Sequence, residues 1–221
     1  MANLSRVDIP APPSLINAPD DYARAYQDSY SNVLRLYFTR LTSVLRALFG
    51  VSGGAILRFP HIAASDLTDQ YAGGNNTPTL VLWDTLDSSE GFTLNPSGSA
   101  TASQQGIYKI DYSLQFVNTD NAQEDLYVWL KVNGSNVPGS ASKFTVPARK
   151  SAGIFGYLIA YSSITFTMNP EDDMELWWQT SKAYNPVGPV NGVYMEYIPA
   201  GGALPSAPSA VGTIAFISAI A

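Results

Sequence analysis

The sequence predicts a mainly β protein, a sandwich or barrel of about 160 residues, preceded by one α-helix and an extended, proline-rich arm. The clearest strand signal is the stretch GIYKIDYSLQF (residues 106–116), in which apolar and polar residues alternate almost without fault. Period two over this length is typical of a strand with one face in a core and the other in water. Apolar residues recur every three or four positions between residues 18 and 49, and prolines are frequent before them.

The composition favours a folded protein without thiol chemistry. Of 221 residues, 46% are hydrophobic and 14% are charged, so a sizeable core can form. The absence of cysteine excludes disulfides, thiolate metal sites and cysteine nucleophiles. No apolar run is long enough for a membrane-spanning helix, and the N-terminus lacks the ordered regions of a signal peptide. We therefore expect a soluble protein without membrane insertion.

The net charge of −6 is unevenly distributed along the chain. Residues 1–60 hold six arginines and four acidic residues, whereas the remainder holds six basic and fourteen acidic residues. This asymmetry suggests that the two ends face different surroundings, with the N-terminal third able to meet an acidic protein surface. The positive charge is too weak for a nucleic-acid site, so no nucleic-acid partner is expected.

Residues 1–18 form the predicted arm, because their prolines impose an extended path with few hydrogen-bond donors. Several apolar side chains give this arm something to bury, which favours an anchor over a plain disordered start, although both interpretations stay open. The residues predicted to anchor it on a larger particle are Leu4, Val7, Ile9, Pro10, Pro12, Pro13 and Leu15.

Residues 19–50 form the predicted helix, which begins near Pro19 and ends before Gly50. Its apolar stripe is wide and follows near-heptad spacing, so it predicts either packing on its own domain or self-association into a stalk. We favour self-association. The residues predicted to mediate it are Tyr30, Val33, Tyr37, Leu41, Val44 and Leu48.

Residues 51–59 are predicted to contain a glycine-rich hinge and a first strand, and residues 60–221 a head domain. Strand signals separated by turn clusters then follow one another to the end of the chain. The predicted strands are 55–59, 79–83, 91–94, 99–102, 107–118, 126–132, 144–146, 155–160, 164–168, 174–179, 193–197 and 211–217.

Some of these strands are apolar on both faces, as LYVWLKV (126–132) and MELWWQT (174–180) illustrate. A sandwich covers only one face of each sheet, so a second aromatic face needs another cover. We expect sister molecules to supply it in a homotrimer. The residues predicted at this head interface are Tyr127, Trp129, Trp177, Trp178 and Phe216.

The residues offer little for catalysis. His61 is the only histidine and has no nucleophile motif beside it, so a structural or interface role is expected. The acidic clusters at 120–125 and 171–173 lack the spacing of a calcium loop and are interpreted as solvated charge, with an intersubunit cation as the open alternative. We expect no enzyme activity, no catalytic residue, no cofactor and no metal.

The order of motifs in the head resembles the tumour-necrosis-factor and complement-head class. The resemblance covers roughly residues 60–220 and rests on a G-x-Y strand at Gly106 and Tyr108, a Lys-x-Asn-Gly turn at 131–134, a strand pair from Phe166 to Leu176, and a closing strand from Gly212 to Phe216. It implies a ten-stranded antiparallel jelly roll. Members of that class form compact trimers, which agrees with the interface predicted above.

The whole chain is similar to small structural proteins of tailed bacteriophages. The similarity rests on the arm, on the helix segment NVLRLYFTRLTSVLRALFG, and on DLYVWLKVNGS and SKFTVPARKS in the head. It implies a capsid-decoration protein or a short fibre or appendage at the virion surface, with other virion proteins as partners. The alternative is a carbohydrate-binding module that uses its tryptophans to recognise a host-surface glycan.

Overall fold

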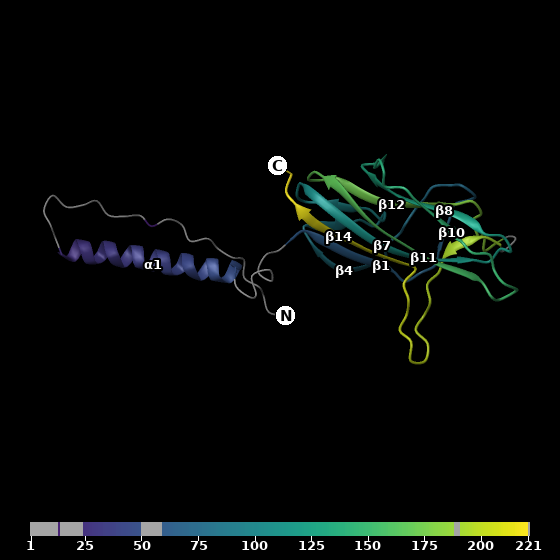
Figure 1. Cartoon of the computed structure of the whole chain (residues 1–221), viewed down its shortest axis with the longest axis horizontal. Coiled ribbons are helices and arrows are strands. Elements are labelled where there is room, and N and C mark those ends of the chain that lie inside the picture. Colours follow the sequence, from purple (N-terminus) through teal and green to yellow (C-terminus); the bar gives the residue numbers. More distant parts are fainter. Residues whose placement is uncertain (1–12, 14–23, 50–58, 188–190, 221) are drawn as a thin grey trace. The chain divides into compact units, whose positions relative to one another are not determined.

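The computed structural model describes residue 13 and residues 24–49, 59–187 and 191–220. The chain divides into two units, Met1–Arg58 and Phe59–Ala221. The described part of the first unit is essentially one helix, and the second unit is the β-rich head (Figure 1).

Helix α1 spans Arg24–Phe49. Its 26 residues contain no glycine or proline, so every interior position can keep helical backbone geometry. Arg24 pairs with Asp28 one turn later at 3.8 Å, and Arg46 lies in the last turn, where positive charge opposes the helix dipole favourably. At 1.5 Å per residue the helix is about 39 Å long.

The head consists of two antiparallel sheets, of which the first, sheet 1, is built around β7. In sheet 1, β7 has the long β11 on one side and β14 on the other, and β1 and β4 continue outward from β14. The short β13 and β2 extend the same sheet next to the end of β7. The strands are β1 (His61–Asp66), β2 (Gln70–Tyr71), β4 (Thr85–Glu90), β7 (Gly106–Asn118), β11 (Gly156–Met168), β13 (Val193–Met195) and β14 (Ala210–Ser218).

The second sheet, sheet 2, has the order β10-β8-β12-β6-β5, with the short β3 beside β12 and the short β9 beside β8. Its strands are β3 (Thr79–Leu80), β5 (Phe92–Leu94), β6 (Ala100–Ala102), β8 (Glu124–Val132), β9 (Ser135–Asn136), β10 (Ser142–Val146) and β12 (Asp173–Thr180). All pairings in both sheets are antiparallel.

This arrangement confirms the predicted fold class: the head is a mainly β, antiparallel jelly-roll sandwich, and the described residues contain one N-terminal helix. The described residues contain fourteen strands rather than ten, because β2, β3 and β9 have only two residues each and other strands are short.

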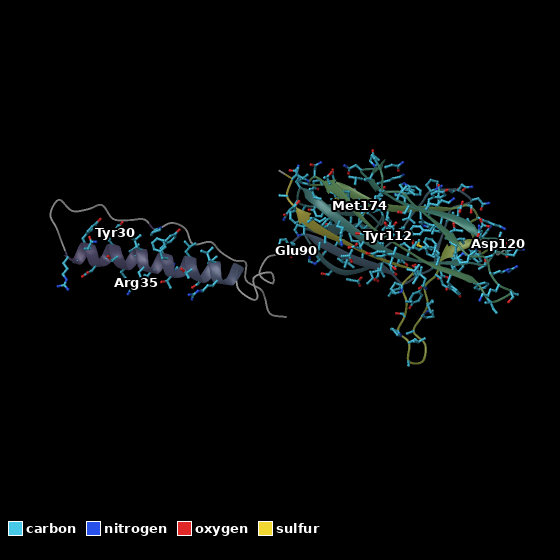
Figure 2. All side chains as sticks on the ribbon, viewed as in Figure 1. Tyr30, Arg35, Glu90, Tyr112, Asp120 and Met174 are labelled. Carbon is cyan, nitrogen blue, oxygen red and sulfur yellow. The ribbon has the colours of Figure 1, made fainter. Side chains whose placement is uncertain are left out.

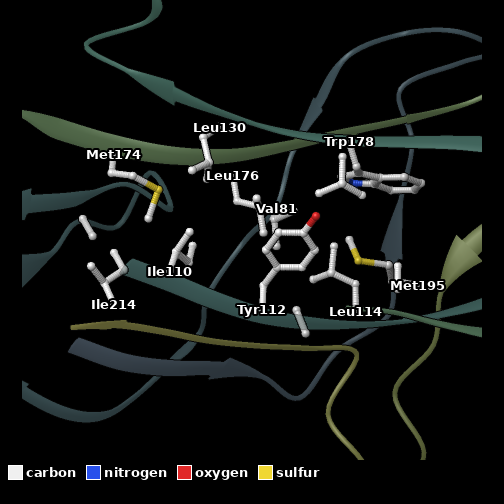
Figure 3. Packing of buried hydrophobic residues seen from close by; sticks show 14 of the residues in the cluster. Val81, Ile110, Tyr112, Leu114, Leu130, Met174, Leu176, Trp178, Met195 and Ile214 are labelled. Atoms are coloured by element: carbon white, nitrogen blue, oxygen red, sulfur yellow. The ribbon is translucent and has the colours of Figure 1, made fainter. Parts of the chain in front are cut away.

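The core lies between the two sheets, and β7 supplies its largest share. Figure 3 shows Ile110, Tyr112 and Leu114 of β7 facing Leu176 and Trp178 of β12. All inward residues of β7 between Tyr108 and Phe116 are buried, and the rings of Phe116 and Trp178 lie 5.3 Å apart. Burial of each large apolar side chain is worth about 1.5–3 kcal/mol, so this contact between sheets is the main source of stability.

A two-residue hairpin joins β8 to β9 and confirms the predicted Asn-Gly turn. Asn133 and Gly134 both adopt positive φ, at 49° and 73°, as a type I′ turn requires. The Asn133 side chain also donates to Asp172 Oδ1 at 2.7 Å and accepts from the backbone N–H of Asp173 at 2.9 Å. The turn therefore connects β8 with the loop before β12.

The sequence missed the longer strands β1 and β4 and the two-residue strands β2 and β9, and it divided another strand. β1 and β4 were not predicted, because HIAASD and TLDSSE have few residues with high strand propensity, and pairing with neighbouring strands holds them extended. The strands predicted at 155–160 and 164–168 are one continuous strand, β11, which pairs with β7 over thirteen residues. The strand predicted at 55–59 falls largely outside the described residues.

A hairpin between β13 and β14 projects from the head, as the yellow loop in Figure 1 shows. Ile198 pairs with Ala207, and Gly201 pairs with Leu204 near the tip. Figure 2 shows the side chains of the head, with Glu90 and Asp120 at its opposite ends.

Candidate functional site

The outward face of sheet 2 brings together three of the five residues predicted at the head interface. Tyr127 and Trp129 are two positions apart on β8, so they point to the same side. Trp177 lies on β12 directly opposite Trp129. Each of the three is half-buried. Their interface role stays a prediction, and the structure places the three side chains on one face.

Polar partners hold these rings in fixed positions. Trp129 Nε1 donates to Asn136 Oδ1 at 3.0 Å, and Trp177 Nε1 donates to Glu175 Oε2 at 2.9 Å. The ammonium group of Lys131 lies 3.8 Å from the centre of the Trp177 ring, which is a cation–π contact. Because both indole N–H groups have an acceptor within the head, the rings are oriented before any ligand or partner arrives.

A shallow depression lies over Tyr127 and Trp129, with an accessible volume of about 290 Å³. The loop between β9 and β10 forms one side of it, and Gln179 of β12 contributes from the other side. Its main lining residues are Tyr127, Trp129, Asn136, Val137, Ser140 and Gln179. This volume is near the lower end of the range for small-molecule sites.

An ion pair borders the depression. Lys143 Nζ lies 2.8 Å from Asp125 Oδ2 and 5.6 Å from the centre of the Tyr127 ring. The hydrogen bond with Asp125 raises the pKa of Lys143, and the same bond lowers the pKa of Asp125. Both groups are therefore charged over a wide pH range.

The predicted interface role of Trp178 is wrong. Its side chain is 0% exposed and packs in the core against Phe116, so it cannot contact a second head. Phe216 also faces inward: its ring packs on Tyr108 at 5.7 Å and lies against Gly106, where an added Cβ would come within 2.5 Å of it. Trp178 is therefore a core residue, whereas Phe216 is half-buried at the edge of the core, and its interface role stays a prediction.

The most exposed apolar row lies on sheet 1 and was not predicted. On β11, the side chains of Tyr157, Ile159 and Tyr161 are 55%, 64% and 60% exposed. We call these three residues the β11 stripe. They occupy alternate positions of one strand, so they point to the same side. The alternation in YLIAY was the available signal, but dividing the strand after residue 160 separated the first two residues from the third.

Two of the three neighbours of the β11 stripe on β7 are polar, and the third, Val117 opposite Tyr157, is buried. Gln115 lies opposite Ile159, and Ser113 lies opposite Tyr161. Lys109 and Asp111, further along the same face of β7, form an ion pair at 2.7 Å that raises the pKa of Lys109. The apolar row is thus confined to the edge of the sheet.

Three tyrosines form a cluster near the end of sheet 1, and the sequence did not predict it. The rings of Tyr71, Tyr184 and Tyr194 lie 4.7–5.7 Å apart. Burial raises the pKa of Tyr194, and burial likewise raises the pKa of Glu196, whose Oε1 accepts from the Tyr194 hydroxyl at 3.3 Å. The rings cover one another, so the cluster acts as a small satellite core.

The predicted self-association residues of the helix share one face. Tyr30, Val33, Tyr37, Leu41 and Val44 are half-buried, whereas Leu36, Phe38 and Leu45 are exposed. The Leu48 side chain lies outside the described residues.

Of the predicted anchoring residues, only Pro13 is described, and it is half-buried. Leu4, Val7, Ile9, Pro10, Pro12 and Leu15 lie outside the described residues.

His61 connects β1 with its neighbour β4. Its Nδ1 lies 2.9 Å from the Phe59 carbonyl oxygen, and its Nε2 lies 3.0 Å from Ser88 Oγ. A serine next to a histidine is the core of a nucleophilic pair, but here a backbone carbonyl occupies the position that a carboxylate takes in a triad. Ser88 is exposed on an edge strand, so the contact is best explained as a bridge between strands, as expected.

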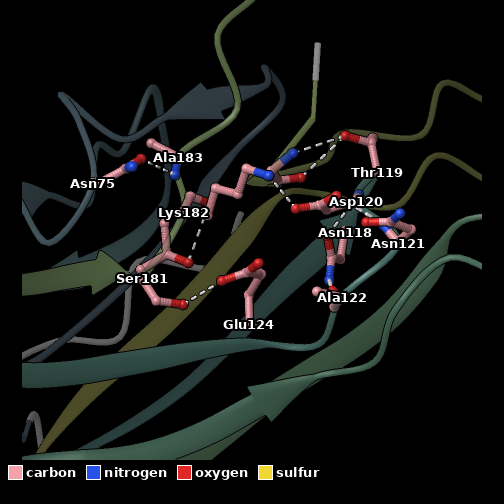
Figure 4. A network of polar contacts seen from close by, with 12 residues as sticks. Asn75, Asn118, Thr119, Asp120, Asn121, Ala122, Glu124, Ser181, Lys182 and Ala183 are labelled. Atoms are coloured by element: carbon pink, nitrogen blue, oxygen red, sulfur yellow. Dashed lines mark hydrogen bonds and ion pairs between the residues drawn. The ribbon is translucent and has the colours of Figure 1, made fainter. Parts of the chain in front are cut away.

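The first acidic cluster is not simply solvated, so that interpretation is wrong for Asp120. This side chain is 6% exposed and forms an ion pair with Lys182, while Glu124 accepts a hydrogen bond from Ser181 (Figure 4). The bond to Lys182 lowers the pKa of Asp120. Within the described ranges, no group of three or more His, Cys, Asp or Glu side chains could hold a metal ion.

The second acidic cluster supports turns. Asp172 accepts from the backbone N–H of Asn169 at 2.7 Å, which lowers its pKa, and Asp173 accepts from Thr101. Glu171 adopts a positive φ of 68° in the same loop. These contacts account for the acids structurally.

No protein-family model matches the chain, and no curated protein sequence matches it. Among solved structures, the chain is similar to the globular domain of the zebrafish complement 1qA protein, with 13% identity and a TM-score of 0.42, covering 74% of this chain and 100% of that chain. None of the described helices is long and apolar enough to cross a membrane.

Proposed function

We propose that the protein is a non-enzymatic structural component of a tailed-phage virion that assembles as a homotrimer. Within this proposal, the head associates with sister heads, and the N-terminal arm and helix attach the trimer to another virion protein. The protein would then act at the virion surface as a capsid-decoration protein or as a short fibre or appendage.

The observation that carries this proposal is the β11 stripe. Three large side chains in one row remain more than half exposed in the isolated head. A contiguous apolar surface of this kind is a typical mark of a protein–protein contact, because leaving it in water is unfavourable. The stripe lies on an edge strand that pairs only with β7 among the described strands, so a second subunit can approach it.

This proposal moves the head contact from sheet 2 to sheet 1. On sheet 2 the rings of Trp129 and Trp177 already have polar partners, and lysines lie beside them. On the β11 stripe, the side chain of Ile159 has no polar group, and this residue is the most exposed of the three. The copy number of three follows the resemblance of the head motifs to a class that forms trimers.

The attachment part of the proposal is supported by the composition of the first sixty residues, which are more basic than the head. The helix adds to it, since its half-buried face follows the spacing of a self-associating helix. Three arms of one trimer would bind the same particle at the same time, and the overall affinity would then exceed the affinity of a single arm.

Two measurements on the full chain test the proposal. Sedimentation should give the mass of a trimer at micromolar concentration, and a monomer under these conditions would contradict head association. Deleting residues 1–18 should abolish incorporation into particles while the trimer still forms. Normal incorporation of the truncated protein would remove the attachment role of the arm.

A further inference from the structure

We propose that the depression on the outward face of sheet 2 binds a neutral pyranose unit of a glycan. The site lies over β8 and beside the β9–β10 loop. It involves none of the residues of the β11 stripe, so it can be tested separately from the virion assignment and from head association.

The floor of the site is aromatic. Tyr127 and Trp129 are two positions apart on β8, which places them about 7 Å apart on the same face of the sheet. A pyranose ring has a flat face of C–H groups, and such a face packs on an aromatic ring with little loss of flexibility in the protein. Two rings at this spacing offer room for one sugar or for two linked sugars.

The wall of the site is formed before any ligand binds. Ser140 Oγ accepts from the backbone N–H of Leu130 at 3.0 Å and donates to the Val137 carbonyl at 2.8 Å. The backbone N–H of Val137 also donates to the Leu130 carbonyl at 3.0 Å. These bonds tie the β9–β10 loop to the core strand β8, so little ordering free energy is lost on binding.

Two side-chain amides are available to sugar hydroxyls. Asn136 uses its Oδ1 to accept from Trp129, which orients both groups and leaves the Asn136 amide nitrogen without a protein partner in the described part of the chain. Gln179 lies opposite Tyr127 and likewise has no side-chain hydrogen bond there. An amide offers both a donor and an acceptor, which matches a pair of neighbouring hydroxyls.

Charge favours a neutral ligand. All residues that line the depression are uncharged, and the nearby Lys143 is already paired with Asp125 at 2.8 Å. An acidic sugar would gain no unpaired cation inside the site. A second copy of this chain fits less well, because covering the whole face would bury the Lys143–Asp125 pair and the Lys131 ammonium at a desolvation cost. A sugar inside the depression leaves these charges in water.

Ligand-observed NMR with the full chain tests the proposal. The probes are the methyl glycosides of glucose, galactose, mannose and N-acetylglucosamine, with glucuronic acid as the charged comparison. We expect at least one neutral probe to bind with a dissociation constant on the order of 1 mM, typical of a single small ligand on an open site. Trp129→Ala should weaken that binding at least about tenfold, since it removes the stacking surface.

Further variants keep the result interpretable. Trp129→Phe keeps a stacking ring and should retain part of the binding, Gln179→Ala should weaken it several-fold, and Thr167→Ala on the other sheet should leave it unchanged. The proposal is overturned if no neutral probe binds the wild-type chain, or if Trp129→Ala binds equally well. It is also overturned if Trp129→Ala lowers the mass of the assembly, because the face would then be a contact between subunits.

Discussion

Replacing Ile159 by Lys is the most direct perturbation of the proposed head contact. Ile159 is the middle residue of the β11 stripe, and 64% of its surface is exposed in the isolated head. Lysine at this position requires no burial of charge within one subunit. It is also a residue with which natural proteins protect edge strands from unwanted pairing, so the head itself should fold normally.

The expected magnitude follows from the exposed fraction. Full burial of an isoleucine side chain is worth about 1.5–3 kcal/mol, so burial of the exposed part of Ile159 in an interface is worth about 1–2 kcal/mol per subunit. The trimer as a whole loses about 3–6 kcal/mol of association free energy, which lowers the trimer association constant by a factor of roughly 10²–10⁴. Repulsion between three lysines around one axis increases the loss further.

Sedimentation equilibrium over a series of concentrations measures this change in the full chain. The matched control is Thr167→Lys, which adds the same charge to an exposed position on the same side of the same strand. We expect the trimer of the Ile159 variant to dissociate at concentrations where the Thr167 variant remains assembled. Equal association constants for the wild-type protein and the Ile159 variant would refute the assignment of the β11 stripe as the head contact.

Three further predictions concern the core, the buried ion pair and the helix. Trp178→Ala should cost about 3–5 kcal/mol in urea unfolding because it empties the core, and Trp177→Ala on the outward face should cost much less; equal losses would contradict the assigned faces. Asp120→Asn should cost about 1.5–3 kcal/mol near pH 7, with the exposed Asp87→Asn as control. Lys182 lowers the pKa of Asp120, so the stabilisation by this ion pair is fully present above about pH 4–5 and is lost as the pH falls through the lowered pKa. If the wild-type protein and the Asp120 variant differed in unfolding free energy by the same amount at about pH 2 as at pH 7, the ion pair could not be the cause. Tyr37→Asp should weaken helix association in sedimentation more than Leu36→Asp, which lies on the exposed face; the reverse order would show that the helix associates through another face.

The sequence predicted best where the side-chain period and the local turn chemistry agree. β7 was predicted almost to its ends because ten residues alternate strictly, and the turn at Asn133 and Gly134 was predicted because Asn-Gly tolerates positive φ. β1 and β4 could not be predicted in this way. Their residues have low strand propensity, and only pairing with β14 and with each other keeps them extended.

The candidate sites depended more strongly on tertiary structure. Trp177 and Trp178 are neighbours in the sequence, and the alternation of β12 assigns them to opposite faces, but it does not say which face meets the other sheet. Packing of Trp178 against Phe116 decided this. The depression over Trp129 was equally invisible, since the β9–β10 loop that forms its wall is held by Ser140 in a conformation that no local pattern specifies.

By itself, the sequence determined the class of the protein. Apolar residues every three or four positions predicted the helix, apolar residues at every second position predicted the β head, and the lack of cysteine excluded thiol chemistry. These features depend on interactions between residues close together in the chain, which a sequence pattern records directly. Only the tertiary structure decided which aromatic side chains are core, which face water and which acid is paired with Lys182. Each of those outcomes depends on contacts between residues far apart in the chain, and the pairing of the sheets creates these contacts.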